Sequence, residues 1–201
     1  GGSGMIWAGG ALAFLAFGHY YKTLENRKEE QHIEAGLKGE EEVARQLADH
    51  LDNRYYIYND LSVRSGFRGA QIDHLVVCPK GIFLIETKNW SGRIVGREDE
   101  KTWMQYRQAG GPGRPLSNPV MQNQRHVNVL EAVLRSGGAP DMAIHPLLVF
   151  RSKYATLDIP DHRATMLWKT ELADYILRYE GAQTYPDATV DAVLARLQRF
   201  A

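Results

Sequence analysis

The sequence predicts an α/β domain in which a central mixed sheet is flanked by helices, with an apolar helix before it. Three observations predict this class. Residues 71–90 contain two apolar runs joined by a turn at Pro79-Lys80-Gly81, as in two neighbouring strands. Residues 82–85 are apolar at every position, which favours a central strand covered on both faces. Residues 37–51 and 119–135 place apolar side chains at helical spacing.

The composition is that of an ordinary globular domain. The 201 residues carry 24 Lys and Arg against 24 Asp and Glu, so the formal net charge is zero. Any surface for nucleic acid must therefore be local, because the overall charge supplies no attraction. The single cysteine, Cys78, excludes a disulfide within the chain and fits a reducing compartment.

The N-terminal segment has a different character from the rest. Residues 1–4 are expected to be a cloning remnant. Residues 5–21 carry no formal charge, have aromatic ends and are followed by basic residues, which favours a membrane anchor with its C-terminal side in the cytoplasm. A helix packed on the domain or on a partner, and a cleaved signal peptide, are the alternatives. Residues 22–32 then form a charged linker, and residues 33–201 a cytoplasmic domain at the inner face of the membrane.

Charged side chains stand at the ends of the two predicted central strands. Asp73 follows the start of the first, and Glu86 and Lys88 lie one strand step apart on the same side of the second. Burying such charges costs free energy unless they have partners. Two interpretations remain open. Asp73 and Glu86 would bind Mg²⁺ or Mn²⁺ while Lys88 positions a water molecule or helps to neutralise the phosphate. The alternative is a buried Asp–Lys or Glu–Lys salt bridge with no catalysis.

Glu40 is a further candidate on the first helix. The apolar stripe of that helix consists of Leu37, Val43, Ala44, Leu47 and Leu51. Glu40 falls near the middle of the stripe and is expected to face the core, whereas Glu41 and Glu42 are expected to be solvated charges. Glu40 would bind the metal or orient water. The alternative is an ion pair with Lys88 or a buried arginine.

Two glycine-rich segments carry arginines that could contact phosphates. Residues 62–70 are predicted to be a flexible loop with Arg64 and Arg68, leading directly to Asp73. The glycines and prolines of residues 109–117 are expected to exclude regular structure there, with Arg107 and Arg114 facing substrate. A solvated loop is the alternative for the first segment.

Asn118-Pro119 predicts the start of a helix that ends near Gly137-Gly138. Gln122 and His126 share its inward stripe with Val129 and Val133. We interpret His126 as a structural histidine.

Together these residues resemble a known family. Ile72-Asp73 followed by Glu86-Thr87-Lys88 has the form of the PD-(D/E)xK nuclease signature, with isoleucine where that name has proline. The flanking motifs are Gly36-Leu-Lys-Gly39-Glu40, Asn59-Asp60-Leu61, Gln71-Ile-Asp-His74, Gly81-Ile-Phe, Gly92, Trp103 and Asn118-Pro119-Val-Met-Gln122. In this order they resemble the nuclease-related domain (NERD) over residues 33 to 150. The resemblance implies a restriction-endonuclease-like core and a magnesium site, with Gln71 and Gln122 as supporting polar groups.

The function predicted from these residues is metal-dependent hydrolysis of phosphodiester bonds in nucleic acid, with DNA favoured over RNA. Glu40, Asp73, Glu86 and Lys88 are the predicted catalytic residues, and Mg²⁺ or Mn²⁺ the predicted cofactor. By analogy with restriction-type folds, a homodimer is a predicted assembly. The alternative function is a catalytically silent, membrane-tethered module that binds nucleic acid or protein on the same scaffold.

Overall fold

The structure is a computed structural model that describes residues 39–201. The segment predicted as a membrane anchor and the charged linker lie outside the described residues. Within the described part, residues 39–50 are helical, and no helix is both long and apolar enough to cross a membrane. The remaining elements are β1 (Tyr56–Ser65), β2 (Arg68–Cys78), β3 (Gly81–Lys88), β4 (Gly92–Val95), β5 (Thr102–Tyr106), β6 (Arg114–Ser117), α2 (Pro119–Ser136), β7 (Ile144–Phe150), β8 (Ala155–Asp158), β9 (Thr165–Trp168), η1 (Lys169–Glu171), α3 (Leu172–Arg178) and α4 (Asp187–Leu197).

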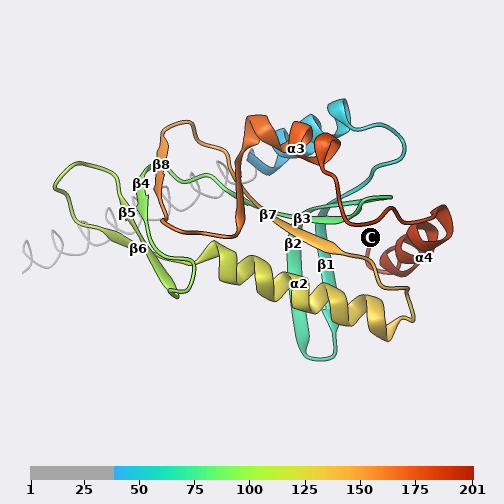
Figure 1. Ribbon diagram of the computed structural model, residues 1–201. Coiled ribbons are helices and arrows are strands. Elements are labelled where there is room, and N and C mark those ends of the chain that lie inside the picture. The colour runs from blue at the N-terminus through green and yellow to red at the C-terminus, as the bar shows by residue number, and fades with distance from the viewer. Residues whose placement is uncertain (1–38) are drawn as a thin grey trace, which may run out of the picture. The chain divides into compact units, whose positions relative to one another are not determined.

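The larger of two sheets has five strands in the order β1-β2-β3-β7-β9. The β1–β2 and β2–β3 pairs are antiparallel, whereas β3–β7 and β7–β9 are parallel, so the sheet is mixed as predicted. The helix of residues 39–50 and α3 lie on one face, and α2 lies on the other (Figure 1). The predicted fold class, mixed α/β with flanking helices, is confirmed for the described residues.

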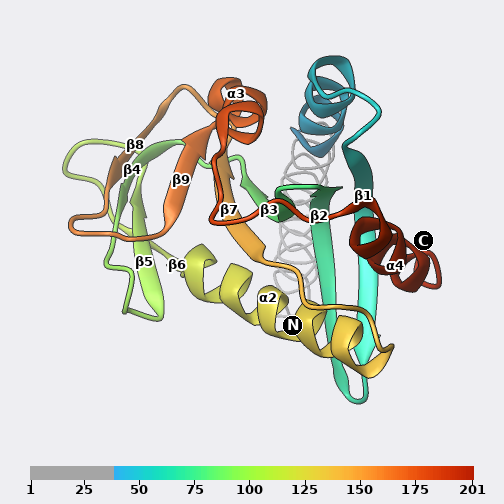
Figure 2. The same cartoon turned by 45° about the vertical axis from the view of Figure 1, so that its right-hand side comes forward.

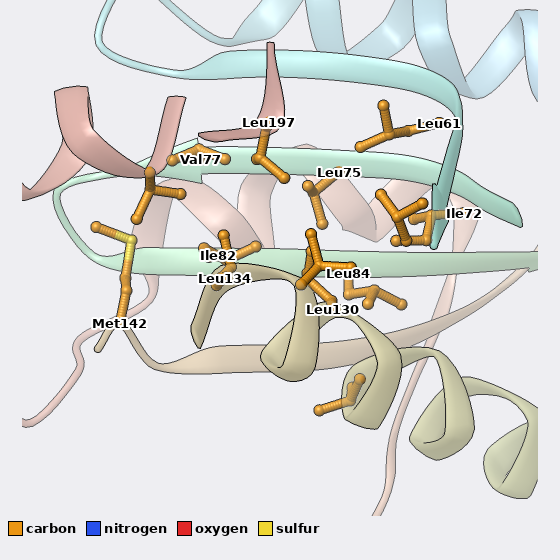
Figure 3. Close-up of a cluster of buried hydrophobic side chains, with 14 of the residues drawn as sticks. Leu61, Ile72, Leu75, Val77, Ile82, Leu84, Leu130, Leu134, Met142 and Leu197 are labelled. Carbon is orange, nitrogen blue, oxygen red and sulfur yellow. The ribbon is translucent and has the colours of Figure 1, made fainter. Parts of the chain in front are cut away.

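Each face of this sheet has its own apolar core. On the α2 face, alternate residues of β2 and β3 such as Leu75 and Leu84 pack against Leu130 of α2 and Leu197 of α4 (Figure 3). On the other face, Phe83 and Ile85 pack with Leu47 of the first helix and with α3. Strand β3 is thus covered on both sides, which explains its unbroken apolar run.

The tight turn predicted between the two central strands is present. Pro79 and Lys80 separate β2 from β3, and Gly81 has φ +123°. A Cβ atom at this position would lie 2.7 Å from the carbonyl oxygen of Ala143. Glycine is therefore required here both for its backbone conformation and for the close approach of the chain.

The smaller sheet contains four strands in the order β6-β5-β4-β8. β3 and β7 are parallel neighbours in the first sheet, and β4 and β8, which follow them in the chain, are parallel neighbours in the second. The expectation that residues 109–117 have no regular structure is wrong for its last part, because Arg114–Ser117 forms β6. Pro115 is tolerated because β6 is an edge strand that pairs with β5 alone.

The second correction concerns residues 62–70, which form a hairpin and not a flexible loop. β1 continues to Ser65 and β2 begins at Arg68, and their register runs without interruption in this part up to the Ser65–Arg68 pair. Val63 and Ala70 are buried, so their contacts hold the hairpin despite its glycines. Only Gly66 and Phe67 lie outside the ladder.

Helix α2 begins as the sequence predicts. The Asn118 Oδ1 atom accepts hydrogen bonds from the backbone N–H groups of Val120 (2.8 Å) and Met121 (3.4 Å). The Asn118 Nδ2 atom donates to the carbonyl oxygens of Glu98 (2.9 Å) and Glu100 (2.7 Å). The cap therefore also joins α2 to the β4–β5 connection, which fixes the end of the helix that carries Gln122.

Candidate functional site

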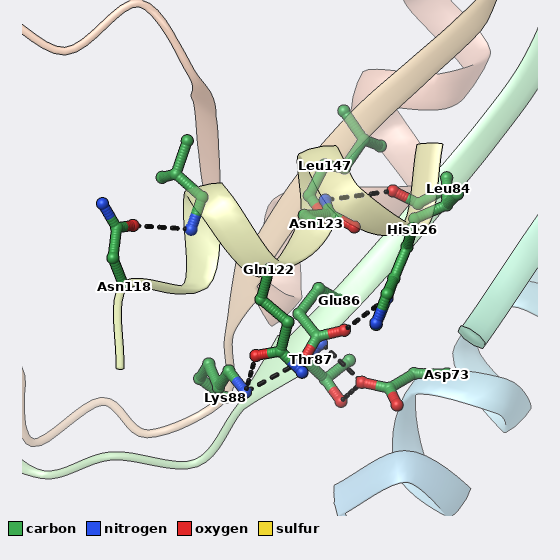
Figure 4. Close-up of polar contacts among 11 residues, drawn as sticks. Asp73, Leu84, Glu86, Thr87, Lys88, Asn118, Gln122, Asn123, His126 and Leu147 are labelled. Carbon is green, nitrogen blue, oxygen red and sulfur yellow. Dashed lines mark hydrogen bonds and ion pairs between the residues drawn. The ribbon is translucent and has the colours of Figure 1, made fainter. Parts of the chain in front are cut away.

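The site lies where β2 separates from β3. The register of this antiparallel pair ends at His74 and Ile85, one residue short of Asp73. The Asp73 Oδ2 atom instead accepts hydrogen bonds from the backbone N–H and the hydroxyl of Thr87, both at 2.9 Å (Figure 4). A side-chain carboxylate thus takes the place of a backbone partner, which fixes Asp73 beside β3.

Glu86 and Lys88 point to the α2 face of β3, as strand alternation predicts. Glu86 is only 3% exposed, and its Oε1 atom lies 2.9 Å from Lys88 Nζ. Lys88 Nζ also donates to Gln122 Oε1 of α2 at 3.1 Å (Figure 4). The predicted inward position of Gln122 is confirmed, and its contact explains how α2 positions the lysine.

His126 is closer to this site than expected for a structural histidine. It is buried, and its Nδ1 atom lies 3.6 Å from Glu86 Oε2. Burial, and next the charge of Arg125, lower the pKa of His126, so the imidazole is neutral at pH 7. The contact is therefore not an ion pair. Its Nδ1 atom has no hydrogen-bond partner among the described residues.

The electrostatics of the site are set by a buried carboxyl group. Burial raises the pKa of Glu86 to about 7, and the negative charges of Asp73 and Glu40 add to this effect while Lys88 opposes it. Glu86 is therefore divided between its neutral and charged forms at physiological pH. A bound cation would favour the charged form.

Glu40 reaches the same site from the helix on the opposite face. Its carboxyl is half-buried, and burial followed by the charges of Asp73 and Asp60 raises its pKa, against the effect of Lys88. Because these charges act on Glu40, the four predicted catalytic residues lie within electrostatic reach of one another. They come from three separate segments of the chain.

The expectation that Glu42 is a solvated charge is wrong. Its carboxylate accepts hydrogen bonds from Arg151, with Nε at 3.1 Å, and from Lys169 Nζ at 2.9 Å. The hydrogen bond from Arg151 and then that from Lys169 lower the pKa of Glu42 to about 2. The helical wheel placed Glu42 away from the apolar stripe, but it cannot show that η1 and the end of β7 supply cations on that side.

Asp60 is a residue of the site to which the sequence reasoning gave no role. Pairs Asn59–His74 and Leu61–Ile72 place it opposite Asp73, and its φ of +54° is unusual for a residue other than glycine. Gln71 Nε2 donates to Asp60 Oδ1 at 2.5 Å. Gln71, predicted as a supporting group, therefore holds the carboxylate of Asp60.

The donor set of the site fits a hard divalent cation, because it consists of carboxylate oxygens beside a single ammonium. Burial, and then the charge of Asp73, raise the pKa of both Glu40 and Glu86, so negative charge is concentrated there. Within residues 39–201, however, no three His, Cys, Asp or Glu side chains are already placed to hold a metal ion. Binding would require Glu86 to exchange its contact with Lys88 for one with the ion.

The predicted phosphate-contacting arginines are exposed but separate. Arg64 and Arg68 lie on the β1–β2 hairpin, Arg114 on β6, and Arg107 just after β5. In the part of the chain that the structure describes, no hydrogen bond or ion pair is recorded between any of them and an acid of the site.

The comparison with known families agrees with this arrangement. It consists of an acid on the strand before a tight turn, a Glu-x-Lys sequence on the next strand and a helix capped by Asn-Pro. A sequence model of the nuclease-related domain matches residues 35–151. The chain belongs to the NERD family. This membership is consistent with the PD-(D/E)xK superfamily, to which the sequence motifs point.

Two curated proteins match parts of this chain. The chain is 33% identical to an uncharacterized protein of Bacillus anthracis over 99 residues, which is 48% of this chain and 45% of that protein. It is 26% identical to a probable kinase, PglW, of Streptomyces coelicolor over 133 residues, which is 66% of this chain and 8% of that protein. The chain thus matches less than half the length of either relative. No solved structure gives a significant match.

Proposed function

We propose that this NERD domain hydrolyses phosphodiester bonds of nucleic acid, DNA before RNA, with Mg²⁺ or Mn²⁺ as cofactor. One observation carries the proposal: Glu40, Asp73, Glu86 and Lys88 converge from three segments, and after burial the charge of Asp73 raises the pKa of both Glu40 and Glu86. A folded protein gains nothing in stability from concentrating like charges beside a buried carboxyl. Such an arrangement is typical of functional sites.

The roles follow from position and burial. Asp73 and Glu86, with Glu40, would hold the cation, which when bound supplies positive charge at the phosphate and acidifies a water molecule. Thr87 fixes Asp73 through two hydrogen bonds to Oδ2. The Oδ1 atom of Asp73 has no hydrogen-bond partner among the described residues. Lys88, released from Glu86 and still held by Gln122 (3.1 Å), would orient the attacking water or neutralise the phosphate.

A second candidate function is supported by the ion pair between Lys88 and Glu86 at 2.9 Å. If this pair persists in the presence of divalent cations, the amine and the most buried acid neutralise each other. The domain would then be a catalytically silent module that binds nucleic acid or protein.

Nicking of supercoiled plasmid DNA separates the two candidates. We expect the 201-residue chain to nick plasmid with Mg²⁺ or Mn²⁺, to lose this activity in EDTA, and to lose it in Glu86→Ala and Lys88→Ala variants. Glu131→Ala is the matched control, because Glu131 is an exposed glutamate on α2. Nicking that survives in Glu86→Ala would exclude the mechanism, and DNA binding without nicking in any divalent cation would favour the silent module. A single-stranded RNA substrate of the same length tests the preference for DNA.

A further inference from the structure

The tip of the β1–β2 hairpin presents an aromatic side chain entirely to solvent. Phe67 is 104% exposed, the largest value among the exposed large hydrophobic residues of the described chain. Gly66 has φ +60°, and Gly66 and Phe67 form the two-residue connection between the strands. A fully exposed phenylalanine gains the free energy of apolar burial only when its ring contacts a partner.

The position of Phe67 is defined by the strands that carry it. Val63 and Ala70 are buried in the core shared with α2, and beyond them the ladder continues to the Ser65–Arg68 pair. In both views the hairpin projects past α2 (Figures 1 and 2). The tip is therefore an extension of the sheet and is ordered by it.

Two arginines flank the exposed ring. Arg64 and Arg68 are exposed, and among residues 39–201 no ion pair or side-chain hydrogen bond is recorded for either. Side chains alternate between the two faces along each strand, and Val63 and Ala70 both face the core. Arg64 is one position from Val63 and Arg68 is two positions from Ala70, so the two arginines lie on opposite faces of the hairpin. The tip thus combines one aromatic ring with two guanidinium groups that are available for anions.

The same two strands carry the acids of the candidate site. Asp60 precedes Ser65 by five positions, and Asp73 follows Arg68 by five positions. At about 3.4 Å per residue the Ser65–Arg68 pair lies roughly 17 Å from these acids and Phe67 roughly 20 Å from Asp73, which corresponds to about five to six base-pair steps of B-form DNA. A duplex whose phosphate lay at the acids could therefore reach the hairpin tip.

We propose that Phe67 stacks on a nucleic acid base or inserts at a base step, while Arg64 and Arg68 contact flanking phosphates, about five to six base pairs from the bond that is cut. The inference rests on the proposed function, because it takes the acid cluster as the place where the substrate backbone lies. Nucleic acid is favoured over a lipid surface because the tip belongs to the strands that hold the acids.

The test measures binding separately from cleavage. The affinity of the full chain for a fluorescein-labelled DNA duplex is measured by anisotropy, in EDTA and again with Ca²⁺, so that no result depends on hydrolysis. We expect Phe67→Ala to raise the Kd about tenfold, and Arg64→Ala to lower the slope of log K against log salt concentration by about one. Tyr154→Ala is the matched control, because Tyr154 is 73% exposed and lies outside the hairpin. Its Kd should equal that of the wild type.

A base analogue then locates the contact. With 2-aminopurine placed at successive positions of the duplex, the wild type should raise its fluorescence at one or more positions by unstacking it, and Phe67→Ala should not. Unchanged affinity and fluorescence in Phe67→Ala would overturn the proposal even if plasmid nicking is intact. If the wild type does not nick plasmid DNA but these binding results hold, the nuclease function is excluded and the hairpin contact with DNA remains. Loss of binding to phosphatidylglycerol vesicles in Phe67→Ala, with DNA affinity unchanged, would assign the tip to a membrane surface instead and also overturn the proposal.

Discussion

When Glu86 is replaced by glutamine, the unfolding free energy of the variant minus that of the wild type should increase as the pH rises. The two side chains have nearly the same shape, so the substitution removes the titratable group from a site that is 3% exposed without opening a cavity. Burial raises the pKa of Glu86 to about 7, which means that the folded state resists its ionisation.

The magnitude follows from linkage between folding and proton binding. Because the folded-state pKa is raised, the contribution of Glu86 to stability is fully present below the unfolded value of 4.5 and is lost as the pH rises through about 7. Between about pH 5.5 and about pH 8.5 this loss is about 2 kcal/mol, which corresponds to about 4–8 °C in Tm for a chain of this size. Glutamine at this position has no such loss.

The assay is urea unfolding of wild type and Glu86→Gln in EDTA across this pH range. The quantity of interest is the difference in unfolding free energy between the two proteins as a function of pH, because other titrating groups are common to both. The ion pair with Lys88 (2.9 Å) forms only when Glu86 is ionised, so its effect is already contained in the pKa of about 7. Glu131→Gln, at an exposed position on α2, should give a difference that does not change with pH.

A difference between wild type and Glu86→Gln that stays constant within about 0.5 kcal/mol across the range would refute the reasoning. It would mean that Glu86 has the same affinity for protons in the folded and unfolded states. The argument that the site concentrates unfavourable negative charge would then lose its main support.

Three further predictions concern metal, catalysis and acid stability. The apparent affinity for Mn²⁺, measured by calorimetry, should rise about tenfold between about pH 6 and about pH 8. The reason is that Glu86, below its pKa of about 7, must release a proton to bind the ion. The Glu86→Gln variant should lose this pH dependence. Lys88→Ala should lower the rate of plasmid nicking by about 10² or more and Gln122→Ala by about tenfold, since Gln122 only holds the amine (3.1 Å). Glu42→Gln should lower the unfolding free energy by about 1 kcal/mol at neutral pH; because the pKa of Glu42 is lowered to about 2, this difference should vanish as the pH falls from 4.5 through 2, as followed by circular dichroism.

Most of the candidate site could be predicted from local periodicity. Strand alternation alone placed Glu86 and Lys88 on one side of β3, and the tight turn at Gly81 returned the chain so that Asp73 came beside them. Helical spacing from the Asn118 cap likewise placed Gln122 toward the strand that carries Lys88. These arguments succeed because each depends on a single element or a single turn.

The parts that were missed depend on contacts between distant segments. Residues 62–70 have the glycines of a loop, yet burial of Val63 and Ala70 under α2 makes them strands. Residues 114–117 contain a proline, yet β5 offers them an edge to pair with. Glu42 has no local partner, and its cations come from residues more than a hundred positions later. Asp60 owes its place opposite Asp73 to the register of β1 and β2.

The separation of β2 from β3 places the candidate site at an unpaired edge of an otherwise paired sheet. On one side β3 stays paired with β7 through Glu86–Leu148 and Lys88–Phe150, so the backbone that carries both functional side chains is fixed. On the other side, the backbone pairing of β2 with β3 stops at His74–Ile85. Beyond it, the Asp73 carboxylate accepts hydrogen bonds from the backbone N–H and the hydroxyl of Thr87. The two hydrogen bonds from Thr87 hold the Asp73 carboxylate at this unpaired edge. Thr87→Val, which keeps the backbone donor and removes the hydroxyl, should therefore weaken Mn²⁺ binding while costing only about 1 kcal/mol of stability.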